Sequence, residues 1–582
     1  MKRPLPLAAL AALLAHGVAA SGAAQAQTRP DAGQVLRELG RPDAAPRPAP
    51  APAAAPAPPI AVPPEPKAAR PDAVATIAVA GFRISGATAF PPAQLERLLD
   101  PWRGRTLTLA DLQDAAERLG SHYREHGYLL ARAYLPAQTI SDGRVEIAVL
   151  EGRVGAIRIE ASSASAADAS ATSAADAFAT SAAVVALARQ ARAITARIEP
   201  GQLAREAELE RMLLLLNDSP GIDRADAALQ PGASVGLSDL IVTLRPGPAV
   251  TGDIGANNHG NRYTGRHLVG GALTLNSPAR LGDQFSARLQ GSDQRLLYTR
   301  LSYRVPLGDD GLVAGAAWTY SRYRLGRDFA ALDAHGDARI GGVFAYYPLL
   351  LTRDFSVTAS IAADRKSLVD RVGALSTEAG KNITLGTAGL SGNLRRRGGA
   401  YAFSLAYTGG ALAIQDPDAR ELDAATARGN GHYAKWTYAA AATFPLAPAW
   451  LASAQVNGQF ARKNLDSSEK FSLGGADGVR AYPQGEAPGD EGVLLTLALR
   501  RALPAPMSGG GAGDTLLGGF IDAGQVRINH APFAAGDNRR RLAAFGVSLD
   551  CPLPAGFQLR GSVAWKFGGG GTRAWLSAAR YF

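Results

Sequence analysis

The sequence has little cysteine, little lysine and, after its first residues, no long hydrophobic run. Cys551 is the one cysteine in 582 residues, which excludes a disulfide within the chain and fits a small residue at a strand end. Arginine outnumbers lysine by 53 to 8, but the arginines are scattered and not clustered with aromatic residues, which argues against nucleic-acid binding. No later segment approaches the roughly 18 consecutive apolar residues of a membrane-spanning helix.

The second half of the chain alternates apolar and polar residues in one short segment after another. From Phe557 to Phe567 the odd-numbered positions are mainly apolar and the even-numbered ones mainly polar. Side chains of a strand point alternately to its two faces, so such a strand has one apolar and one polar face. The pattern recurs too often for one soluble core, and the chain stops on an aromatic residue, Phe582. A large soluble all-β enzyme would not explain that end, so we predict a transmembrane β-barrel over residues 247–582.

The number of strands follows from the length of this region. Roughly 335 residues, at about 21 per strand and connection, predict about 16 antiparallel strands, and even numbers are usual in bacterial barrels.

The N-terminal residues read as a signal peptide over 1–26. Lys2 and Arg3 precede an apolar stretch, and Ala24-Gln25-Ala26 predicts cleavage between Ala26 and Gln27. Residues 27–40 contain a short predicted helix, Asp31 to Leu39, with Asp31 as its N-cap. Residues 41–73 are rich in proline and alanine and predict an extended linker.

Two small modules of helices and strands are predicted before the barrel. In residues 74–153 we expect a strand at 75–82, helices at 92–99 and from a capping box at Thr108 and Asp111 to Gly127, and strands at 128–134 and 144–150. Residues 154–246 predict a looser copy, with a strand at 154–160, a helix at 202–216 and a strand at 237–244. Its Ala/Ser/Thr/Asp run at 161–182 predicts a disordered surface insertion.

Two short motifs resemble catalytic or metal sites. Gly232 to Gly236 matches the G-x-S-x-G nucleophile pattern, but Pro231 precedes it and a strand follows, so a hairpin turn is expected. His122 and His126 have the spacing of zinc ligands, but Tyr123 stands where zinc proteases need glutamate, and we expect two exposed helix histidines. We therefore predict no catalytic, metal or cofactor site.

The most informative pair of segments lies late in the chain. Residues 471–483 form a long glycine-bearing connection that contains Arg480, and 520–524 lie in a predicted strand. Leu517 and Ile521 share one face of that strand, which turns Asp522 into the barrel. A carboxylate in a confined interior needs a cation or hydrogen bonds, and Arg480 can supply a bidentate pair. The spacing equally allows an exposed loop arginine and an unrelated aspartate.

These motifs together resemble the TpsB transporters of two-partner secretion, the hemolysin activation/secretion group. Val479, Arg480, Ala481 and Tyr482 are similar to the V-R-G-Y loop tip of that family, and Phe520-x-Asp522-x-Gly524 is similar to its F-x-D-x-G strand motif. Further similar segments are 127–136 and 151–153, which resemble its first POTRA domain, and 253–265, which resembles the start of its barrel. Ala481, in place of glycine, and Arg580, near the end of the last strand, depart from the family pattern.

The resemblance implies two periplasmic POTRA domains, 74–153 and 154–246, before a 16-stranded barrel whose pore is plugged by the helix in 27–40. It implies an outer-membrane pore of a Gram-negative bacterium that exports one large partner protein, bound through the POTRA domains, without a cofactor or enzymatic activity. Outer-membrane lipid and the barrel-assembly machinery are further expected partners, and the chain is expected to act as a monomer. A passive porin and a barrel-assembly factor are the alternatives; an autotransporter and an outer-membrane enzyme fit less well.

Overall fold

The computed structural model describes residues 30–39, 76–140, 142–161, 187–396, 398–503 and 515–582. The predicted cleavage between Ala26 and Gln27, the linker at 41–73 and all but the first residue of the predicted insertion at 161–182 lie outside these ranges. No helix in the described ranges is long and apolar enough to cross a membrane.

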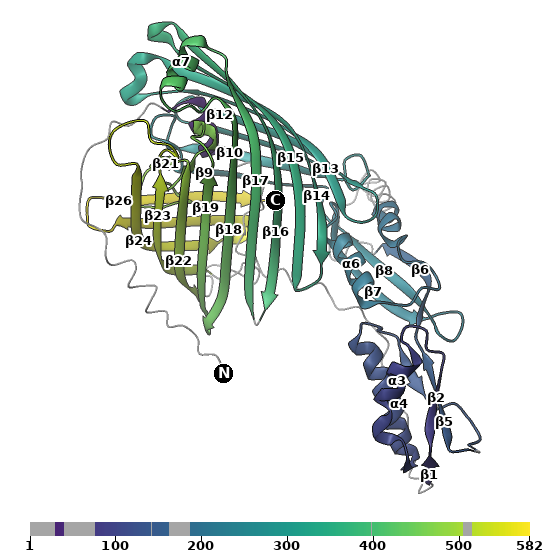
Figure 1. Cartoon of the computed structure of the whole chain (residues 1–582). Helices are drawn as coiled ribbons and strands as arrows, with labels where there is room; N and C mark the ends of the chain where they lie inside the picture. Colours follow the sequence, from purple (N-terminus) through teal and green to yellow (C-terminus); the bar gives the residue numbers. More distant parts are fainter. Residues whose placement is uncertain (1–29, 40–75, 141, 162–186, 397, 504–514) are drawn as a thin grey trace.

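Residues 250–581 form one closed barrel of sixteen antiparallel strands in which each strand pairs with the next and the last pairs with the first (Figure 1). The predicted architecture and strand number are thus confirmed. The strands are β9 Val250–Asn257, β10 Leu268–Asn276, β11 Gln284–Ser292, β12 Leu297–Leu307, β13 Leu312–Arg324, β14 Ala334–Leu351, β15 Phe355–Val372, β16 Thr377–Arg396, β17 Gly399–Ile414, β18 Gly431–Ala447, β19 Trp450–Ala461, β22 Glu491–Leu503, β23 Thr515–Arg527, β24 Arg539–Pro552, β25 Phe557–Lys566 and β26 Thr572–Tyr581.

The alternating sequence pattern sets which side chains face the membrane. On β23, Leu517 and Ile521 are 47% and 39% exposed on the outer face, whereas Asp522 is 0% exposed in the interior. The wall is uneven in height, because β14 to β18 have 16 to 20 residues and β9 to β11 only 8 or 9. A membrane-spanning strand needs about 9 to 11 residues, so the long strands continue beyond the membrane.

Short elements occupy the connections at the far end of the long strands. The helix α7 Pro417–Ala425 follows β17, and the 3₁₀ turns η2 Arg327–Leu332 and η3 Gly373–Leu375 follow β13 and β15. Figure 1 shows α7 at the end of the barrel opposite the two N-terminal modules. A further turn, η5 Pro554–Gly556, lies at the opposite end, between β24 and β25.

The first module is an α+β unit built around α4 Leu109–Glu125. The predicted capping box is present: the Thr108 hydroxyl accepts from the Asp111 amide, and the Asp111 carboxylate accepts from the Thr108 amide. The other elements are β1 Thr76–Val79, β2 Gly81–Ser85, α3 Pro92–Leu98, η1 Asp100–Trp102, β3 Arg105–Thr108, β4 Arg132–Tyr134 and β5 Arg144–Leu150. The predicted strand at 75–82 is two strands, and the one at 128–134 is shorter because Tyr128 to Ala131 form a turn.

The prediction of two exposed histidines is wrong for one of them. His122 is 7% exposed, with its ring centroid 5.0 Å from that of Phe90 and its Nε2 atom 3.4 Å from the Gln94 amide nitrogen. The loop before α3 covers this part of α4, a contact that helical spacing alone does not show.

The second module repeats this plan with one helix and one strand more than the sequence predicted. Its elements are β6 Arg153–Ala161, a helix at 187–195, α6 Glu206–Asn217, β7 Ile222–Pro231 and β8 Leu237–Pro246. β7 was missed because two of its four buried positions, Ala225 and Ala227, are small and weaken the alternating apolar pattern. Gly232 to Gly236 form the hairpin turn between β7 and β8, as predicted.

The second module is fastened to the near end of the barrel. On α6, Arg211 donates to Asp310, in the turn between β12 and β13, and to the Pro348 carbonyl on β14. Glu210 accepts from the backbone amide of Arg353, in the next turn. Arg197 also pairs with Asp310. These contacts attach the second module to the barrel, and Figure 1 shows both modules below it.

Candidate functional site

The short helix α2, Ala32–Leu39, lies inside the barrel, toward the end that carries α7 (Figure 1). Its N-cap is Asp31, whose Oδ1 accepts from the Gln34 amide at 2.8 Å. Ala32, Val35 and Leu36 are 1%, 2% and 4% exposed and form one apolar face. That face packs against inward side chains of the wall, including Tyr323, Leu368, Ile383, Leu385, Leu412 and Tyr433. An isolated helix of this length is marginal in water, so these contacts hold it.

Polar contacts fix the first turn of α2 against β15 and β16. The Ala32 amide donates to Asp370 at 2.7 Å, and Asp31 accepts from the Lys381 ammonium at 3.1 Å and from the Ser467 hydroxyl at 2.6 Å. Burial disfavours the charged form of Asp31, but the Lys381 ammonium and the hydrogen bonds outweigh burial and lower its pKa to about 2. Asp31 is therefore an ionised anchor for the helix.

The helix rests on the long connection between β19 and β22, residues 462–490, which folds into the barrel. This inward loop contains η4 Ser467–Glu469 and the short strands β20 Phe471–Ser472 and β21 Pro488–Gly489. Gly33 permits the close approach, because a Cβ atom there would lie 2.8 Å from the Ser468 backbone nitrogen. The Arg37 guanidinium donates to the Ser467 carbonyl at 2.8 Å, although its Nε and Nη2 atoms have no hydrogen-bond partner among the described residues.

Two lysines of the wall hold η4 in turn. Lys366 on β15 and Lys435 on β18 pair with the two carboxylate oxygens of Glu469 at 2.5 and 2.9 Å. Burial disfavours the charged form of Glu469, but the two ammonium groups outweigh it and lower its pKa to about 2. No sequence motif predicted this cluster. Its one signal is the scarcity of lysine, since Lys366, Lys381, Lys435 and Lys470 all pair with carboxylates inside the barrel.

At its tip the inward loop places Arg480 against Asp522 of β23. The Arg480 Nε and Nη2 atoms donate to the two carboxylate oxygens at 2.8 and 2.7 Å. Asp522 also accepts from the Arg480 amide at 3.2 Å and the Thr496 hydroxyl at 3.0 Å. The Arg480 guanidinium carbon lies 3.1 Å from the centre of the Phe520 ring, a cation–π contact. Each oxygen of this buried carboxylate thus accepts two hydrogen bonds.

The remaining predicted tip residues are packed around this pair. Val479 and Ala481 are 0% and 3% exposed, and the Lys566 ammonium lies 4.6 Å from the centre of the Tyr482 ring. Gly524 makes room for the loop, because a Cβ atom there would lie 2.5 Å from a methyl group of Leu473. Ala481, where the family pattern has glycine, is therefore buried in the loop tip.

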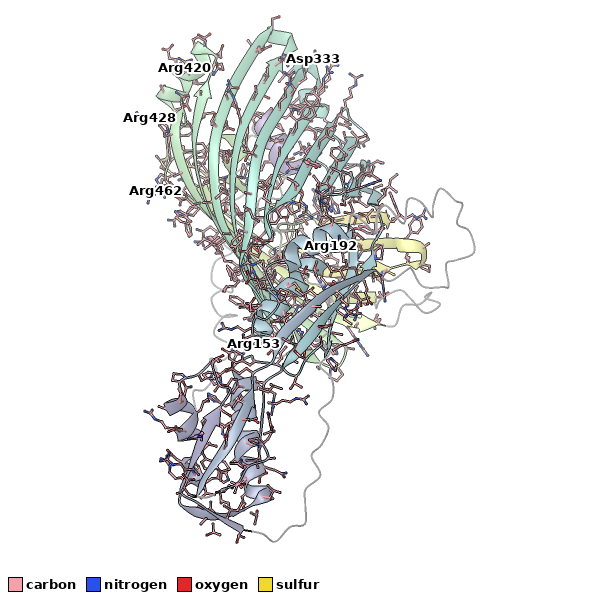
Figure 2. All side chains as sticks on the ribbon, turned by 90° about the vertical axis from the view of Figure 1, so that its right-hand side faces the viewer. Arg153, Arg192, Asp333, Arg420, Arg428 and Arg462 are labelled. Carbon is pink, nitrogen blue, oxygen red and sulfur yellow. The ribbon has the colours of Figure 1, made fainter. Side chains whose placement is uncertain are left out.

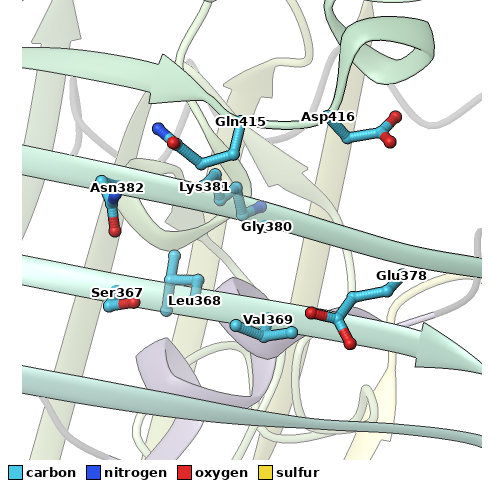
Figure 3. Close-up of a pocket in the computed structure, with 9 residues that line it drawn as sticks. All are labelled: Ser367, Leu368, Val369, Glu378, Gly380, Lys381, Asn382, Gln415 and Asp416. Carbon is cyan, nitrogen blue, oxygen red and sulfur yellow. The ribbon is translucent and has the colours of Figure 1, made fainter.

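A recess of about 440 Å³ opens between β15 and β16 beside the start of α7. Figure 3 shows α2 behind these strands. The residues that line the recess are Ser367, Leu368, Val369, Glu378, Gly380, Lys381, Asn382, Gln415 and Asp416. Its charged groups are already used: Glu378 pairs with Arg371, Lys381 with Asp31, and Asp416 caps α7. We therefore place the functional site in the barrel interior, not in this recess.

Two family models match the chain. The model described as POTRA domain, ShlB-type, matches residues 77–152, and the model described as Haemolysin secretion/activation protein ShlB/FhaC/HecB matches residues 236–550. Among curated proteins, the heme/hemopexin transporter protein HuxB of Haemophilus influenzae is 28% identical over 414 residues, which are 71% of this chain and 69% of HuxB. The outer membrane transporter CdiB of Escherichia coli is 23% identical over 450 residues, 75% of this chain and 71% of CdiB.

Solved structures of similar shape support the fold. CdiB from Escherichia coli superposes with a TM-score of 0.70 at 20% identity, over 90% of this chain and 94% of that chain. CdiB from Acinetobacter baumannii superposes with a TM-score of 0.61 at 16% identity, over 87% of this chain and 90% of that chain.

Proposed function

Because the chain belongs to the haemolysin secretion/activation family ShlB/FhaC/HecB, we propose that it carries one large secreted protein across the outer membrane through the barrel interior. It is an outer-membrane transporter with its POTRA domains in the periplasm. The observation that supports the proposal is that α2 occupies the barrel interior but is not part of the wall. The helix is held to the wall and the inward loop by apolar packing, hydrogen bonds and an ion pair, and we propose that it leaves the interior when the client passes.

Client recognition is proposed for the sheet edges of the two POTRA domains. In the first, β5 lies between β2 and β4, and in the second, β8 lies between β6 and β7, so each sheet has two edge strands. An edge strand offers unpaired backbone groups to which an unfolded chain can add by hydrogen bonding. The client would then enter the barrel extended, and its folding outside the cell would supply the free energy of transport. Insertion by the barrel-assembly machinery, action as a monomer and the lack of enzymatic chemistry belong to the same proposal.

The test first identifies a large exported protein encoded in the reading frame beside this gene and then measures its secretion in a reporter strain. Deletion of residues 76–246 is expected to leave a folded barrel in the outer membrane and to abolish export, because client binding is lost. The matched control carries Arg103→Gln, which removes an exposed ion pair with Asp100 of η1, outside the two three-stranded sheets, and is expected to export normally. Undiminished export by the deletion variant would disprove recognition by the POTRA domains.

A further inference from the structure

On the outer face of β13, β14 and β15, the side chains change from apolar to basic between successive outward positions of each strand. Outward side chains below the change are apolar: Trp318, Val343 and Ile361 are 45%, 59% and 65% exposed. The first charged outward residue above it is arginine on all three strands: Arg322 after Tyr320, Arg339 after Gly341, and Arg365 after Ala363.

The strand register brings these three arginines together. Arg365 lies in the row of Gly341 and Trp318, Arg339 in the next row with Tyr320, and Arg322 in the row above, opposite Asp337. Strands are about 4.8 Å apart and alternate residues about 6.7 Å along a strand, so neighbouring arginines of this diagonal are about 8 Å apart at their Cα atoms. Two guanidinium groups can therefore reach one anion.

Nearby carboxylates do not neutralise this basic diagonal. Arg322 and Arg365 are exposed and have no ion-pair partner among the described residues, and Arg339 has only a 3.7 Å contact with Asp337. Asp337 itself is closer to Arg371, at 2.9 Å, which also pairs with Glu378. Arg324 pairs with Asp333. On β16 the outward residues of the Arg365 and Arg339 rows are Thr384 and Asn382, so the diagonal ends there.

Aromatic side chains place the diagonal at the membrane surface. The Trp318 and Tyr320 rings are stacked, with centroids 6.1 Å apart and planes 5° apart, and Tyr407 and Trp436 are in contact farther around the wall. Such outward aromatics form the girdles of outer-membrane barrels at the boundary between hydrocarbon and headgroups. The arginines follow directly on the side of α7, which is the extracellular side because the POTRA domains lie at the other end (Figure 1).

We propose that Arg322, Arg339 and Arg365 bind the phosphate groups of a phosphorylated glycolipid headgroup in the outer leaflet. Guanidinium groups form bidentate, charge-assisted hydrogen bonds with phosphate, and the apolar strip with Trp318 below them suits the acyl chains of the same molecule. A free anion would need only the arginines, whereas a lipid needs both parts. This site lies on the outside of the wall and is independent of the transported protein. It anchors the tall side of the barrel in the outer leaflet.

The test uses the full-length protein in detergent micelles with added bisphosphorylated lipid A, with bound lipid counted by native mass spectrometry. The triple variant Arg322→Gln, Arg339→Gln, Arg365→Gln is expected to lower the affinity for lipid A at least about tenfold, since each arginine near an anionic surface contributes about fivefold. The charge-matched control is Arg420→Gln, Arg428→Gln, Arg462→Gln, at the extracellular end near α7 (Figure 2). It is expected to bind like the wild type.

Further variants and ligands decide the proposal. The triple lysine variant keeps the charge and is expected to retain most of the binding. If the triple glutamine variant fails to fold, the affinity of the single variant Arg365→Gln for lipid A is measured in its place and is expected to be about fivefold lower than that of the wild type. Lipid A without phosphate groups should bind no better to the wild type than to the glutamine variant. Equal losses in the variant and its control would mean non-specific charge attraction, and displacement of lipid A by millimolar inorganic phosphate would mean a site for a free anion; either result overturns the proposal.

Discussion

The indole N–H of Trp575 donates a hydrogen bond of 2.7 Å to the backbone carbonyl of Arg480. Trp575 lies on β26, the strand that closes the barrel, while the Arg480 side chain pairs with Asp522 on β23. The tip of the inward loop is therefore held between two separate parts of the wall. Nearer its start, the same loop contacts α2 through η4. The loop tip and the helix therefore belong to one assembly inside the barrel.

The first prediction concerns Arg480 and Asp522. Arg480→Ala and Asp522→Ala should each impair export more than they impair barrel assembly, because each leaves a charge without its partner. Breaking a buried pair costs about 3–5 kcal/mol, which water in the interior will reduce. The double variant should export little less than either single one, because the two residues act as a unit. Export and the amount of folded protein in the membrane are the measurements.

Thr496→Val is the matched control for this cycle. It removes one hydrogen bond from a neutral hydroxyl to the Asp522 carboxylate and should cost about 1.5–3 kcal/mol, without leaving either charge unpaired. Fully additive losses in the double variant, with both single variants present at wild-type amounts, would show that Arg480 and Asp522 act separately.

The second prediction concerns the close approach of α2 to the inward loop. Gly33→Val should dislodge the helix, because its Cβ atom would meet Ser467 and Ser468. Ion conductance in planar bilayers should rise toward that of a variant lacking residues 27–70, while export survives. Ala32→Gly, on the same turn without added bulk, is the control. Unchanged conductance in both the Gly33→Val variant and the deletion would mean that α2 does not occlude the pore.

Sequence patterns predicted the parts of this site that depend on local geometry. The inward direction of Asp522 follows from the two-residue period of a strand, and the Asp31 cap follows from its place before Ala32. The pairing of Lys366 and Lys435 with Glu469 could not be predicted, because it depends on a loop that returns into the barrel across three strands. The positions of these residues in the sequence do not show which strands the loop crosses inside the barrel.

The third prediction is the pH dependence of plugging. The pKa of Asp31 is about 2 with the helix bound and 3.8 as a free side chain. A carboxyl group with a lowered pKa contributes stability above its free value and loses it as the pH falls toward the bound value. The wild-type pore should therefore stay closed from about pH 7 to about pH 5, and its conductance in bilayers should rise as the pH falls from about 4 toward about 2.

Lys381→Met should reverse the dependence of pore conductance on pH. Without the ammonium, the buried Asp31 carboxylate is unfavourable, and protonation relieves that cost, so the variant should be leakiest at neutral pH and close as the pH falls. Lys566→Met, which removes a lysine near Tyr482, is the control and should behave as the wild type. Parallel pH profiles for Lys381→Met and the wild type would exclude Asp31 as the anchor.

The last prediction concerns His122 in the first POTRA domain. Burial lowers its pKa from 6.5, and so do the neighbouring His126 and Arg118, while Glu125 opposes them. A histidine with a lowered pKa keeps the folded state fully stable above 6.5, and stability declines below it because the unfolded chain takes up the proton first. Hydrogen exchange of α4 in the full-length protein, corrected for intrinsic rates, should therefore speed up between about pH 7.5 and about pH 5.5. His122→Phe should remove this dependence, because its ring can pack on Phe90 without titrating, whereas His267→Asn, in the loop before β10, should keep it. An unchanged pH dependence in His122→Phe would assign the effect to another group.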